Sequence, residues 1–244
     1  MPYFKLIKID ATDSTNSLLK QRYLANSCLD GEVLWTSIQR QGRGQRNTVW
    51  LSDPGKNLAF SIYKEFNTAE VQNPFLLSCL VSLGVQAALE SLMIPQLCVK
   101  WPNDILSGEK KICGVLIENM FKGSLLHASI VGIGLNVNQE NFKNLPRAAS
   151  MLQISGTTYD LQDVLATCLD HIRQKLELIN LPEEQIIKLY EASLYRIGKP
   201  STFETDGRLL TGIIRGVSLQ GLLKVQLEDS QMALFDLKTI QLKN

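Results

Sequence analysis

The sequence predicts an α+β fold in which a β-sheet is followed by long helices and then by a small β domain. Short segments rich in β-branched or aromatic residues, bounded by Gly, Pro or Asn, fill the first half of the chain. Longer segments with apolar residues at helical spacing come next. After Tyr195 the chain returns to short alternating segments between turn residues. Strands first and long helices later are typical of α+β folds.

The predicted strands share short length, β-branched or aromatic content and turn residues at both ends. They are Pro2–Ile9, Val33–Ile38, Leu58–Tyr63, Leu97–Trp101, Lys111–Asn119 and Leu125–Ile133. A Ser107-Gly108 turn between Ile105-Leu106 and Lys111-Ile112 predicts a tight hairpin, so part of the sheet should be antiparallel. Helical periodicity predicts four helices, at Thr15–Leu24, Pro74–Met93, Leu161–Ile179 and Glu183–Leu194.

The uncharged run from Val71 to Leu89 could be mistaken for a membrane span. Polar side chains recur along it every four residues, at Ser78, Ser82, Gln86 and Glu90. This narrow polar stripe predicts a nearly buried helix of a globular core. Asn73 as N-cap and Pro74 at the first helical position supply its start signal.

A domain boundary is expected at residue 195, because Ile197-Gly198-Lys199-Pro200 ends the last predicted helix. We therefore expect one domain over residues 1–195 and a second over 196–244. The length and turn spacing of the second domain favour an SH3-like barrel. Its charges are balanced, with six Lys and Arg against five Asp and Glu from Gly198 onward, so no polyanion-binding signal resides there.

Charge and cysteine content limit the function classes. With 25 Lys and Arg against 24 Asp and Glu, the net charge is +1, so DNA is not an expected partner. Any polyanion should be small and held locally. The cysteines are odd in number, widely spaced and without CxxC: Cys28, Cys79, Cys98, Cys113 and Cys168. Reduced thiols and an N-terminus without the apolar region of a signal peptide predict a cytoplasmic protein.

The most informative stretch is the basic, glycine-containing loop from Gln39 to Trp50. It carries three arginines and two glycines, Arg40, Arg43, Arg46, Gly42 and Gly44, and no acid lies between Val33 and Ser52. Glycines let the backbone wrap closely around a ligand, and guanidinium forks bond phosphate oxygens bidentately. A phosphate-binding loop is one interpretation, and a solvated basic loop is the other.

A second candidate segment is Lys100-Trp-Pro-Asn-Asp104. Proline after Trp101 favours an extended conformation and a strand end, from which Asn103 and Asp104 can point into a pocket. Gly114 within the next predicted strand implies that a ligand or another backbone approaches closely. Lys111 beside it is a candidate anion contact. The alternatives are an ordinary strand-to-turn exit and a solvated lysine.

Several common active-site patterns are missing from the sequence. There is no GxxxxGK[ST] motif, and Gly132-Ile-Gly134-Leu-Asn136 fails the Rossmann fingerprint because no clear helix follows it. His127 falls in a predicted strand and His171 in a predicted helix, and neither neighbours a plausible nucleophile in a recognised pattern. Nucleophilic catalysis is therefore not expected.

Five motifs, each weak alone, occur together in one order. They are Asp13-Ser-Thr-Asn16, Gly42-Arg-Gly44 with Trp50, Lys100 to Asp104, Lys111-Ile-Cys-Gly114 through Glu118, and Gly132-Ile-Gly-Leu-Asn-Val-Asn138. In this order and spacing the chain resembles the biotin protein ligases over essentially its whole length. The resemblance implies a mixed-sheet catalytic domain related to class II aminoacyl-tRNA synthetases, followed by an SH3-like domain.

The resemblance also implies a two-step reaction. The carboxylate of biotin attacks the α-phosphate of ATP, with Mg²⁺, and releases pyrophosphate. The biotinyl-AMP then acylates a lysine of an apo biotin carboxyl carrier protein, such as that of acetyl-CoA carboxylase. Because no enzymic nucleophile is needed, the catalytic task is positioning and charge neutralisation.

Site residues follow from the resemblance, position by position. It implies catalytic roles for Arg43, Lys111 and Asp104, the last orienting metal or the acceptor amine. It implies biotin contacts from Ser14, Thr15, Asn16, Gln39, Arg43, Gly44, Gln45, Lys111 and Gly114. It implies nucleotide contacts from Arg46, Trp50, Asn103, Gly132, Gly134 and Asn136. It implies no set of protein side chains dedicated to a metal.

The basic loop departs from the family pattern at one position. Many members continue it as Gly-Arg-Gly-Arg, whereas Gln45 stands at the last of these places and Arg46 follows. A neutral amide does not replace a cation, so we expect Arg46 to reach the phosphate from the adjacent position. We also expect the Arg40–Arg46 loop to become ordered over bound ligand, since the anhydride hydrolyses in water.

Two other functions remain open. Lipoate ligases share the fold, although the Lys100–Asp104 motif and the Arg43–Trp50 loop favour biotin. A catalytically silent biotin-binding module is the second alternative. Some members carry an N-terminal winged helix that binds DNA. Only twelve residues precede Asp13, so we expect a monofunctional ligase with no DNA or membrane partner, and a homodimer is possible.

Overall fold

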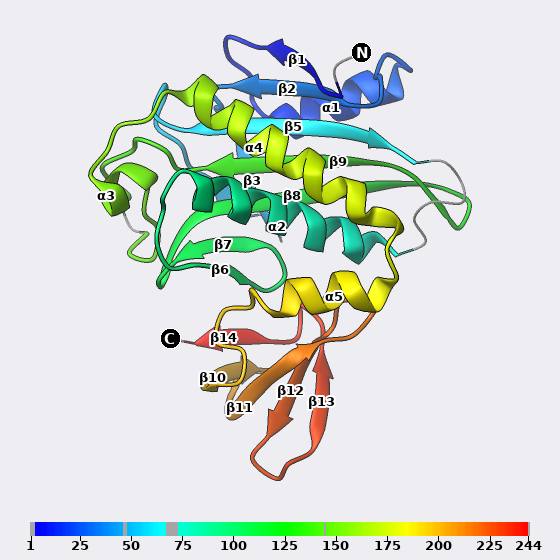
Figure 1. The fold of residues 1–244 in the computed structure, drawn as a ribbon, viewed down its shortest axis with the longest axis vertical. Helices are drawn as coiled ribbons and strands as arrows, with labels where there is room; N and C mark the ends of the chain where they lie inside the picture. The colour runs from blue at the N-terminus through cyan, green and yellow to red at the C-terminus, as the bar shows by residue number, and fades with distance from the viewer. Residues whose placement is uncertain (1–2, 46–47, 67–72, 144, 244) are drawn as a thin grey trace.

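The computed structural model describes residues 3–45, 48–66, 73–143 and 145–243. Its centre is a seven-stranded sheet (Figure 1). The strand order is β1 (Lys5–Lys8), β2 (Glu32–Thr36), β5 (Leu58–Glu65), β9 (Leu125–Leu135), β8 (Lys110–Lys122), β7 (Asp104–Ser107) and β6 (Leu97–Lys100). Only the β1–β2 pair is parallel among these described strands, so the sheet is mixed.

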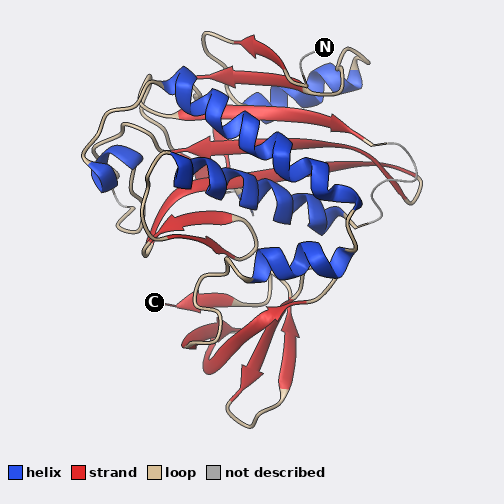
Figure 2. Ribbon diagram, in the orientation of Figure 1, coloured by secondary structure: helices blue, strands red, loops and turns tan. Residues whose placement is uncertain are grey.

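Helices cover the two faces of this sheet unequally. The long helices α2 (Pro74–Ser91) and α4 (Leu161–Leu176) lie across one face (Figure 2). The short α1 (Thr15–Leu24) packs on the other face against β2, β5 and β9. Successive strand side chains point to opposite faces, so Phe60 packs in the α2–α4 core and Ser61 faces α1. Because α1 is short, it leaves part of this face of the large sheet uncovered, where a site can form.

Helix α2 begins as the sequence predicts. The Asn73 side chain accepts a hydrogen bond from Phe75 N at 3.1 Å, and Pro74 is the first helical residue. In the part of the chain that the structure describes, α2 alone is long and apolar enough to cross a membrane, and 61% of that window is buried inside the protein. A Cβ at Gly84 would lie 2.7 Å from Ile172 Cα, so α2 and α4 approach at backbone contact.

Most of the polar stripe of α2 faces the protein interior rather than solvent. Ser78 and Ser82 are both buried, and Ser82 Oγ donates to Ser78 O at 2.8 Å within the helix. Gln86 is half-buried and Glu90 is exposed, so the stripe reaches solvent only near its C-terminal end. The expectation of a nearly buried helix is confirmed.

The C-terminal part forms a five-stranded antiparallel sheet. Its order is β13 (Met232–Phe235), β12 (Leu223–Leu227), β11 (Arg208–Val217), β10 (Pro200–Thr205) and β14 (Gln241–Lys243). No pairing joins β13 to β14 among the described strands, so the structure shows an antiparallel sheet. A closed SH3-like barrel stays a prediction.

Hydrogen bonds join this sheet to the rest of the chain. Trp101 Nε1 donates to Gly221 O at 2.9 Å, and Asn73 Nδ2 donates to Leu219 O at 2.7 Å. Helix α5 (Glu183–Glu191) lies between the two sheets (Figure 1), and its Glu191 carboxylate accepts from Val217 N at 2.8 Å. The C-terminal sheet is thus held against the end of the large sheet that carries β6.

Most differences from the predicted elements concern ends and very short pieces. A two-stranded hairpin, β3 (Gly42–Arg43) and β4 (Val49–Trp50), lies inside the predicted basic loop. The predicted helix over Leu161–Ile179 tightens into a 3₁₀ turn, η2 (Glu177–Asn180), and a one-turn helix, α3 (Met151–Ser155), was not predicted. The Ser107-Gly108 hairpin is confirmed between β7 and β8.

Candidate active site

A cavity of about 370 Å³ lies on the α1 side of the large sheet. It is enclosed by the first turn of α1, the β3–β4 hairpin and strands β8 and β9. Most of the predicted site residues line it: Ser14, Thr15, Asn16, Gln39, Arg43, Gly44, Gln45, Trp50, Asp104, Lys111, Gly114, Gly132 and Gly134. Segments up to 227 residues apart in sequence therefore meet at one place.

One end of the cavity is uncharged and polar. Ser14 is the N-cap of α1, and its Oγ accepts from Ser17 N at 3.4 Å. Thr15 N donates to Gln39 Oε1 at 3.0 Å, which ties α1 to the basic loop. Ser61 Oγ on β5 lies 2.6 Å from Thr15 Oγ1 and 2.6 Å from Asn16 Oδ1. The start of α1 is thus both a capped helix end and a place where several polar side chains converge.

Asn16 also connects to Glu118 on β8. Its Nδ2 donates to Glu118 Oε2 at 3.1 Å and to Leu116 O at 3.2 Å. A Cβ at Gly132 would lie 2.1 Å from Asn16 Oδ1, so only glycine leaves room for this side chain. Gly132 thus makes room for Asn16 at the polar end of the cavity, and its expected contact with nucleotide stays a prediction.

Glu118 forms ion pairs with two cationic side chains beside the cavity. Arg43 Nη2 lies 2.6 Å from Glu118 Oε2, and Lys20 Nζ lies 3.3 Å from Oε1. Burial alone would raise the pKa of the Glu118 carboxyl, but the Asn16 hydrogen bond and the charges of Arg43 and Lys20 outweigh it and hold this pKa below its ordinary value. Glu118 is therefore an ionised partner that Arg43 holds in the free protein.

The Trp50 indole lines the cavity and rests on two glycines. Gly114 and Gly134 face each other across β8 and β9. A Cβ at Gly134 would lie 2.5 Å from Trp50 Cε2, and one at Gly114 would lie 3.0 Å from Trp50 Cζ3. The sequence indicated that a ligand or another backbone comes close to Gly114. In the structure the approaching group is a side chain, because the flat indole needs a surface without Cβ atoms.

The charged end of the cavity holds an ion pair between neighbouring strands. Lys111 Nζ lies 2.7 Å from Asp104 Oδ1, and both side chains are about one-third exposed, at 37% and 29%. Lys111 Nζ also lies 5.7 Å from the centroid of the Trp50 ring. No group of three His, Cys, Asp or Glu that could hold a metal occurs among the described residues. Asp104 is the carboxylate nearest to this end.

Two predicted nucleotide contacts lie behind the cavity wall. Asn103 is buried, donates through Nδ2 to Ser78 Oγ at 3.2 Å and accepts from Gln45 Nε2 at 2.6 Å. Asn136 is buried and donates to Ala149 O at 3.0 Å. Neither lines the cavity, because each side chain turns toward neighbouring segments of the protein. Asn103 holds Gln45 of the wall, and the nucleotide contacts expected of Asn103 and Asn136 stay predictions.

Two arginines of the basic loop lie among the described residues. Arg43 lines the cavity, and Arg40 and Arg43 both line a neighbouring hollow that also includes Glu118. Arg46 lies outside the described residues. Gln45 donates to Asn103 and to Val115 O at 3.3 Å, so its amide is held in the wall between loop and sheet.

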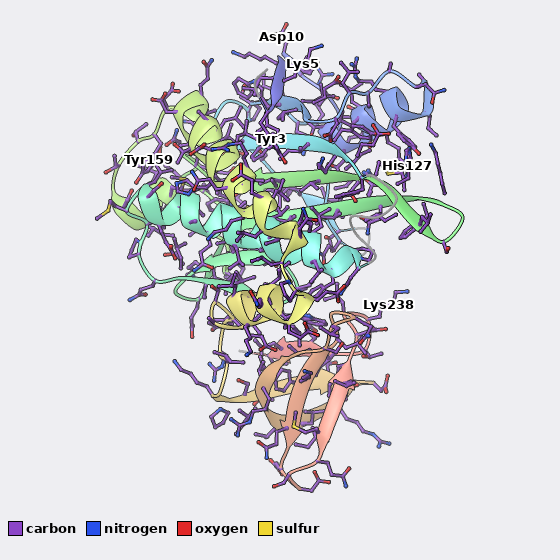
Figure 3. The ribbon with its side chains drawn as sticks, turned by 45° about the vertical axis from the view of Figure 1, so that its right-hand side comes forward. Tyr3, Lys5, Asp10, His127, Tyr159 and Lys238 are labelled. Carbon is purple, nitrogen blue, oxygen red and sulfur yellow. The ribbon has the colours of Figure 1, made fainter. Side chains whose placement is uncertain are left out.

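Sequence reasoning missed several lining or supporting residues. Ser61 and Glu118 had no predicted role, and Leu237 and Gln241 reach the cavity from the C-terminal sheet. Lys238, next to Leu237, lies on the side of that sheet nearest the large domain (Figure 3). A serine within the apolar run Leu58–Tyr63 is a local signal for Ser61, and Glu118 ends one of the five motifs. Nothing local in the sequence marks Leu237 or Gln241.

The described lining of the cavity does not pair a nucleophile with a histidine base. Its described lining includes neither cysteine nor histidine, and the five cysteines are free thiols. Burial raises the pKa of Cys98 to about 11 and that of Cys168 to about 12, so both stay protonated at neutral pH. The arrangement suits binding and charge neutralisation, with a polar uncharged end and a charged end joined by an aromatic surface.

Comparison with known proteins adds independent findings. The model of the Biotin/lipoate A/B protein ligase family matches residues 9–136, more than half of the chain. The bifunctional ligase/repressor BirA of Salmonella typhimurium is 27% identical over 223 residues, which cover 88% of this chain and 67% of that protein. The biotin–[acetyl-CoA-carboxylase] ligase of Mycobacterium tuberculosis is 27% identical over 214 residues, covering 86% of this chain and 79% of that protein.

A solved structure is similar over almost the full length of both chains. The biotin protein ligase from Aquifex aeolicus, in complex with biotin and ATP, is 29% identical to this chain. The match covers 98% of this chain and 99% of the Aquifex chain, with a TM-score of 0.83. The match therefore includes the C-terminal sheet as well as the cavity.

Proposed function

This chain belongs to the Biotin/lipoate A/B protein ligase family, and we propose that it joins biotin to a carrier protein at the expense of ATP. In the first step it forms biotinyl-AMP and pyrophosphate. In the second it transfers biotin to a lysine of an apo biotin carboxyl carrier protein. The likeness to a ligase that holds biotin and ATP, over 98% of this chain, carries the proposal.

The order of groups along the cavity fits this chemistry. The hydroxyls and amides of Ser14, Thr15 and Asn16 can bond an uncharged ring that has both donors and acceptors, as the ureido ring of biotin has. Lys111 stands at the other end, where the carboxylate and the α-phosphate must meet. Two anions approach only when cations neutralise them, and this is the contribution we assign to Lys111 and Arg43.

Arg43 has to exchange partners in this scheme. Its guanidinium is paired with Glu118 in the free protein, and bound biotinyl-phosphate would compete for it. We propose that this exchange accompanies closure of the Arg40–Arg46 loop over the ligand. Protease cleavage within the loop should slow when biotin and ATP are present together, and equal cleavage with and without them would contradict closure.

The donor set near Lys111 suits Mg²⁺ bound mainly through the substrate. Mg²⁺ usually keeps several waters and binds one or two carboxylates together with phosphate oxygens. Asp104 would be the protein carboxylate, which agrees with the lack of any three-ligand cluster among the described residues. When bound, the ion would add positive charge on the polyphosphate. Asp104 would also remain the partner that orients Lys111.

Trp50 and Gly134 are assigned to the nucleotide side of the cavity, whereas Gly114, under the same indole, is assigned to biotin. A broad aromatic face over two glycines offers a stacking surface for adenine. Asn103 accepts a hydrogen bond from the Gln45 side chain and so positions Gln45. We place Gln39, Gly44 and Gln45 along biotin and its carboxylate, as the family pattern implies.

The substitution at Gln45 can be tested directly. We propose that Arg46 supplies the cation that Gln45 lacks. Biotin-dependent exchange of pyrophosphate into ATP should then fall at least tenfold in Arg46→Ala as well as in Arg43→Ala, because each removes a charge-assisted contact to phosphate. Wild-type exchange in Arg46→Ala beside an inactive Arg43→Ala would show that Arg46 is not the substitute.

One experiment tests the function as a whole. The protein is incubated with ATP, Mg²⁺ and an apo carrier domain, with either biotin or lipoate, and the intact mass of the carrier is measured. We expect the mass increase of one biotinyl group and none with lipoate. A lipoyl increase would assign the other branch of the family. Biotin binding without release of pyrophosphate would identify a silent binding module.

The larger organisation is proposed in the same terms. Residues 1–195 form the biotin- and ATP-binding domain, and residues 196–244 form an SH3-like domain that contributes Leu237 and Gln241 to the cavity. A cytoplasmic location, a monofunctional chain without DNA binding and a possible homodimer stay predictions.

A further inference from the structure

Ser61 is a buried hydroxyl to which the two-step reaction described above gives no role. It lies in the apolar strand β5, is completely buried and pairs with Gly132 of β9. A hydroxyl in such a place is costly unless it is hydrogen-bonded. Its two partners, Thr15 and Asn16, line the cavity, so Ser61 acts on a ligand only through them.

The side-chain amide of Asn16 has one chemically sound orientation. Its nitrogen, Nδ2, lies 3.2 Å from Leu116 O and 3.1 Å from Glu118 Oε2. A carbonyl oxygen and an ionised carboxylate only accept hydrogen bonds, so the NH2 group must face them and donates one hydrogen to each. Asn16 Oδ1 therefore faces Ser61 Oγ, at 2.6 Å, and this oxygen too can only accept.

This orientation fixes the direction of the next two hydrogen bonds. An amide oxygen carries no proton, so the proton between Ser61 Oγ and Asn16 Oδ1 belongs to Ser61. Ser61 then has no second proton for Thr15 Oγ1, although these two oxygens lie only 2.6 Å apart. Two hydroxyl oxygens approach so closely only with a proton between them, so Thr15 donates to Ser61. The contact from Thr15 Oγ1 to Gln39 Oε1, at 3.4 Å, is longer and does not receive that proton.

Thr15 therefore presents an acceptor to the cavity. Its single proton points to Ser61, so Thr15 Oγ1 offers only lone pairs to a ligand. An acceptor at this place bonds a ring N–H and repels a ring oxygen, because a buried acceptor without a donor is costly. The ureido ring of biotin carries N–H groups, whereas the dithiolane ring of lipoate carries none.

We propose that Ser61 is a positioning residue that makes the site specific for a ring with N–H groups. It acts through Thr15, whose hydroxyl it holds as an acceptor, and the Glu118 carboxylate sets the order of the bonds from the other end. Without Ser61 the Thr15 proton is able to turn toward the cavity, and the hydroxyl then accepts or donates as the ligand requires. This inference rests on the proposed ligase function and adds a residue that selects its acid.

Calorimetric titration with biotin and two analogues tests this role. In each analogue an oxygen atom replaces one ring N–H, so that a donor becomes an acceptor. We expect the wild-type protein to bind biotin at least about a hundredfold tighter than the weaker analogue, whose oxygen faces Thr15. In Ser61→Ala this ratio should fall about tenfold or more, because the released Thr15 hydroxyl donates to the ring oxygen.

The matched control is Ser129→Ala, at a second completely buried serine. Ser129 Oγ also bonds an asparagine, Asn119 Oδ1, at 2.7 Å. It lies three residues from Gly132 along β9, so its side chain points to the opposite face of the sheet from Ser61. This variant should keep the wild-type ratio of affinities. Ser61→Cys, with a weaker hydrogen-bonding group of similar shape, should lower the ratio and keeps the test valid if Ser61→Ala does not fold.

Kinetics of biotinyl-AMP formation give a second measurement. The ring is remote from the reacting carboxylate, so Ser61→Ala should raise the KM for biotin about fivefold and change kcat by less than about twofold. A wild-type ratio near one, or equal weakening of all three ligands in Ser61→Ala, would overturn the inference. Biotin binding without biotinyl-AMP formation by the wild-type protein would instead refute the ligase function, while the affinity ratios would still decide the role of Ser61.

Discussion

At the scale of single residues, Glu118 illustrates how the site is held before ligand arrives. It accepts from Asn16 on one oxygen and pairs with Arg43 and Lys20. Asn16 in turn can fit only because Gly132 has no side chain. The Glu118 carboxylate therefore bonds both Asn16 at the polar end of the cavity and Arg43 of the basic loop.

The lowered pKa of Glu118 predicts a pH-dependent contribution to stability. The folded state favours the carboxylate, so the contribution is present at neutral pH and is lost as the pH falls through the lowered pKa of the folded state. We expect Glu118→Gln to reduce the free energy of unfolding at pH 7 by about 1 kcal/mol or more. This difference should shrink below about pH 4, near the ordinary value for Glu.

Urea unfolding at both pH values measures this difference. Glu228→Gln, at an exposed position beyond β12, is the control and should change the free energy of unfolding by less than about 0.5 kcal/mol. The same loss in Glu118→Gln at pH 7 and at low pH would show that ionisation of Glu118 is not the cause.

The variant Gly134→Ala tests whether the Trp50 indole packs directly on Gly134. A methyl group there would lie 2.5 Å from Trp50 Cε2, so Gly134→Ala must displace the ring. Overpacking of this kind costs about 1–3 kcal/mol of unfolding free energy. In a Trp50→Ala background the same change should cost much less, since the clashing group is gone. Additive effects in the double variant, measured by urea unfolding, would contradict the packing of Trp50 on Gly134.

At the scale of elements, the N-cap residues of α4 and α2 differ, because only the second also bonds to other elements. Asp160 caps α4 by accepting from Gln162 N and Asp163 N. Asn73 caps α2 and also donates to Glu183 Oε2 at 3.1 Å and to Leu219 O at 2.7 Å. One side chain thus joins α2, α5 and the C-terminal sheet.

Replacing these two caps separates local from tertiary contributions. Loss of a cap alone costs about 1 kcal/mol, which we expect for Asp160→Ala. Asn73→Ala also leaves its two acceptors without this donor, so we expect about 2 kcal/mol or more. Urea unfolding of the two variants measures the difference. Equal losses would mean that the bonds of Asn73 to other elements contribute nothing.

Local sequence was informative for elements because their signals lie within a few residues. Asn73-Pro74 predicted the start of α2, and Ser107-Gly108 predicted the β7–β8 turn. Ends were less well predicted: the helix from Leu161 becomes a 3₁₀ turn after Leu176. The periodicity of apolar residues continues through that change, and the contacts that tighten the last turn lie elsewhere in the chain.

At the scale of the whole molecule, the junction between the two sheets shapes the candidate site. Trp101, next to Lys100, donates to Gly221 O, and Tyr190 Oη of α5 donates to Pro102 O at 2.6 Å. The C-terminal sheet thereby holds the segment from which Asp104 emerges. Leu237 and Gln241 then reach the cavity.

The variant Trp101→Phe keeps an aromatic side chain and removes the bond to Gly221. We expect a loss of about 1 kcal/mol in unfolding free energy and faster protease cleavage between the sheets, near residues 196–199. Met232→Leu, on the exposed edge strand β13, is the control and should leave cleavage unchanged. Unchanged cleavage in Trp101→Phe would show that this bond does not hold the junction.

The sequence by itself determined the fold class, the main helices and strands, and most residues that line the cavity. The elements follow from periodicity, caps and turns, which act between near neighbours. The lining residues follow from the resemblance that five motifs carry only together. Only the tertiary structure decided that Ser61 and Glu118 hold Asn16, that Trp50 lies on two glycines, and that Asn103 and Asn136 stand behind the wall. Only it brought Leu237 and Gln241 to the site. The physical reason is that such contacts form between side chains far apart in the chain, and close packing selects them only when the sheets, helices and junction are all in place.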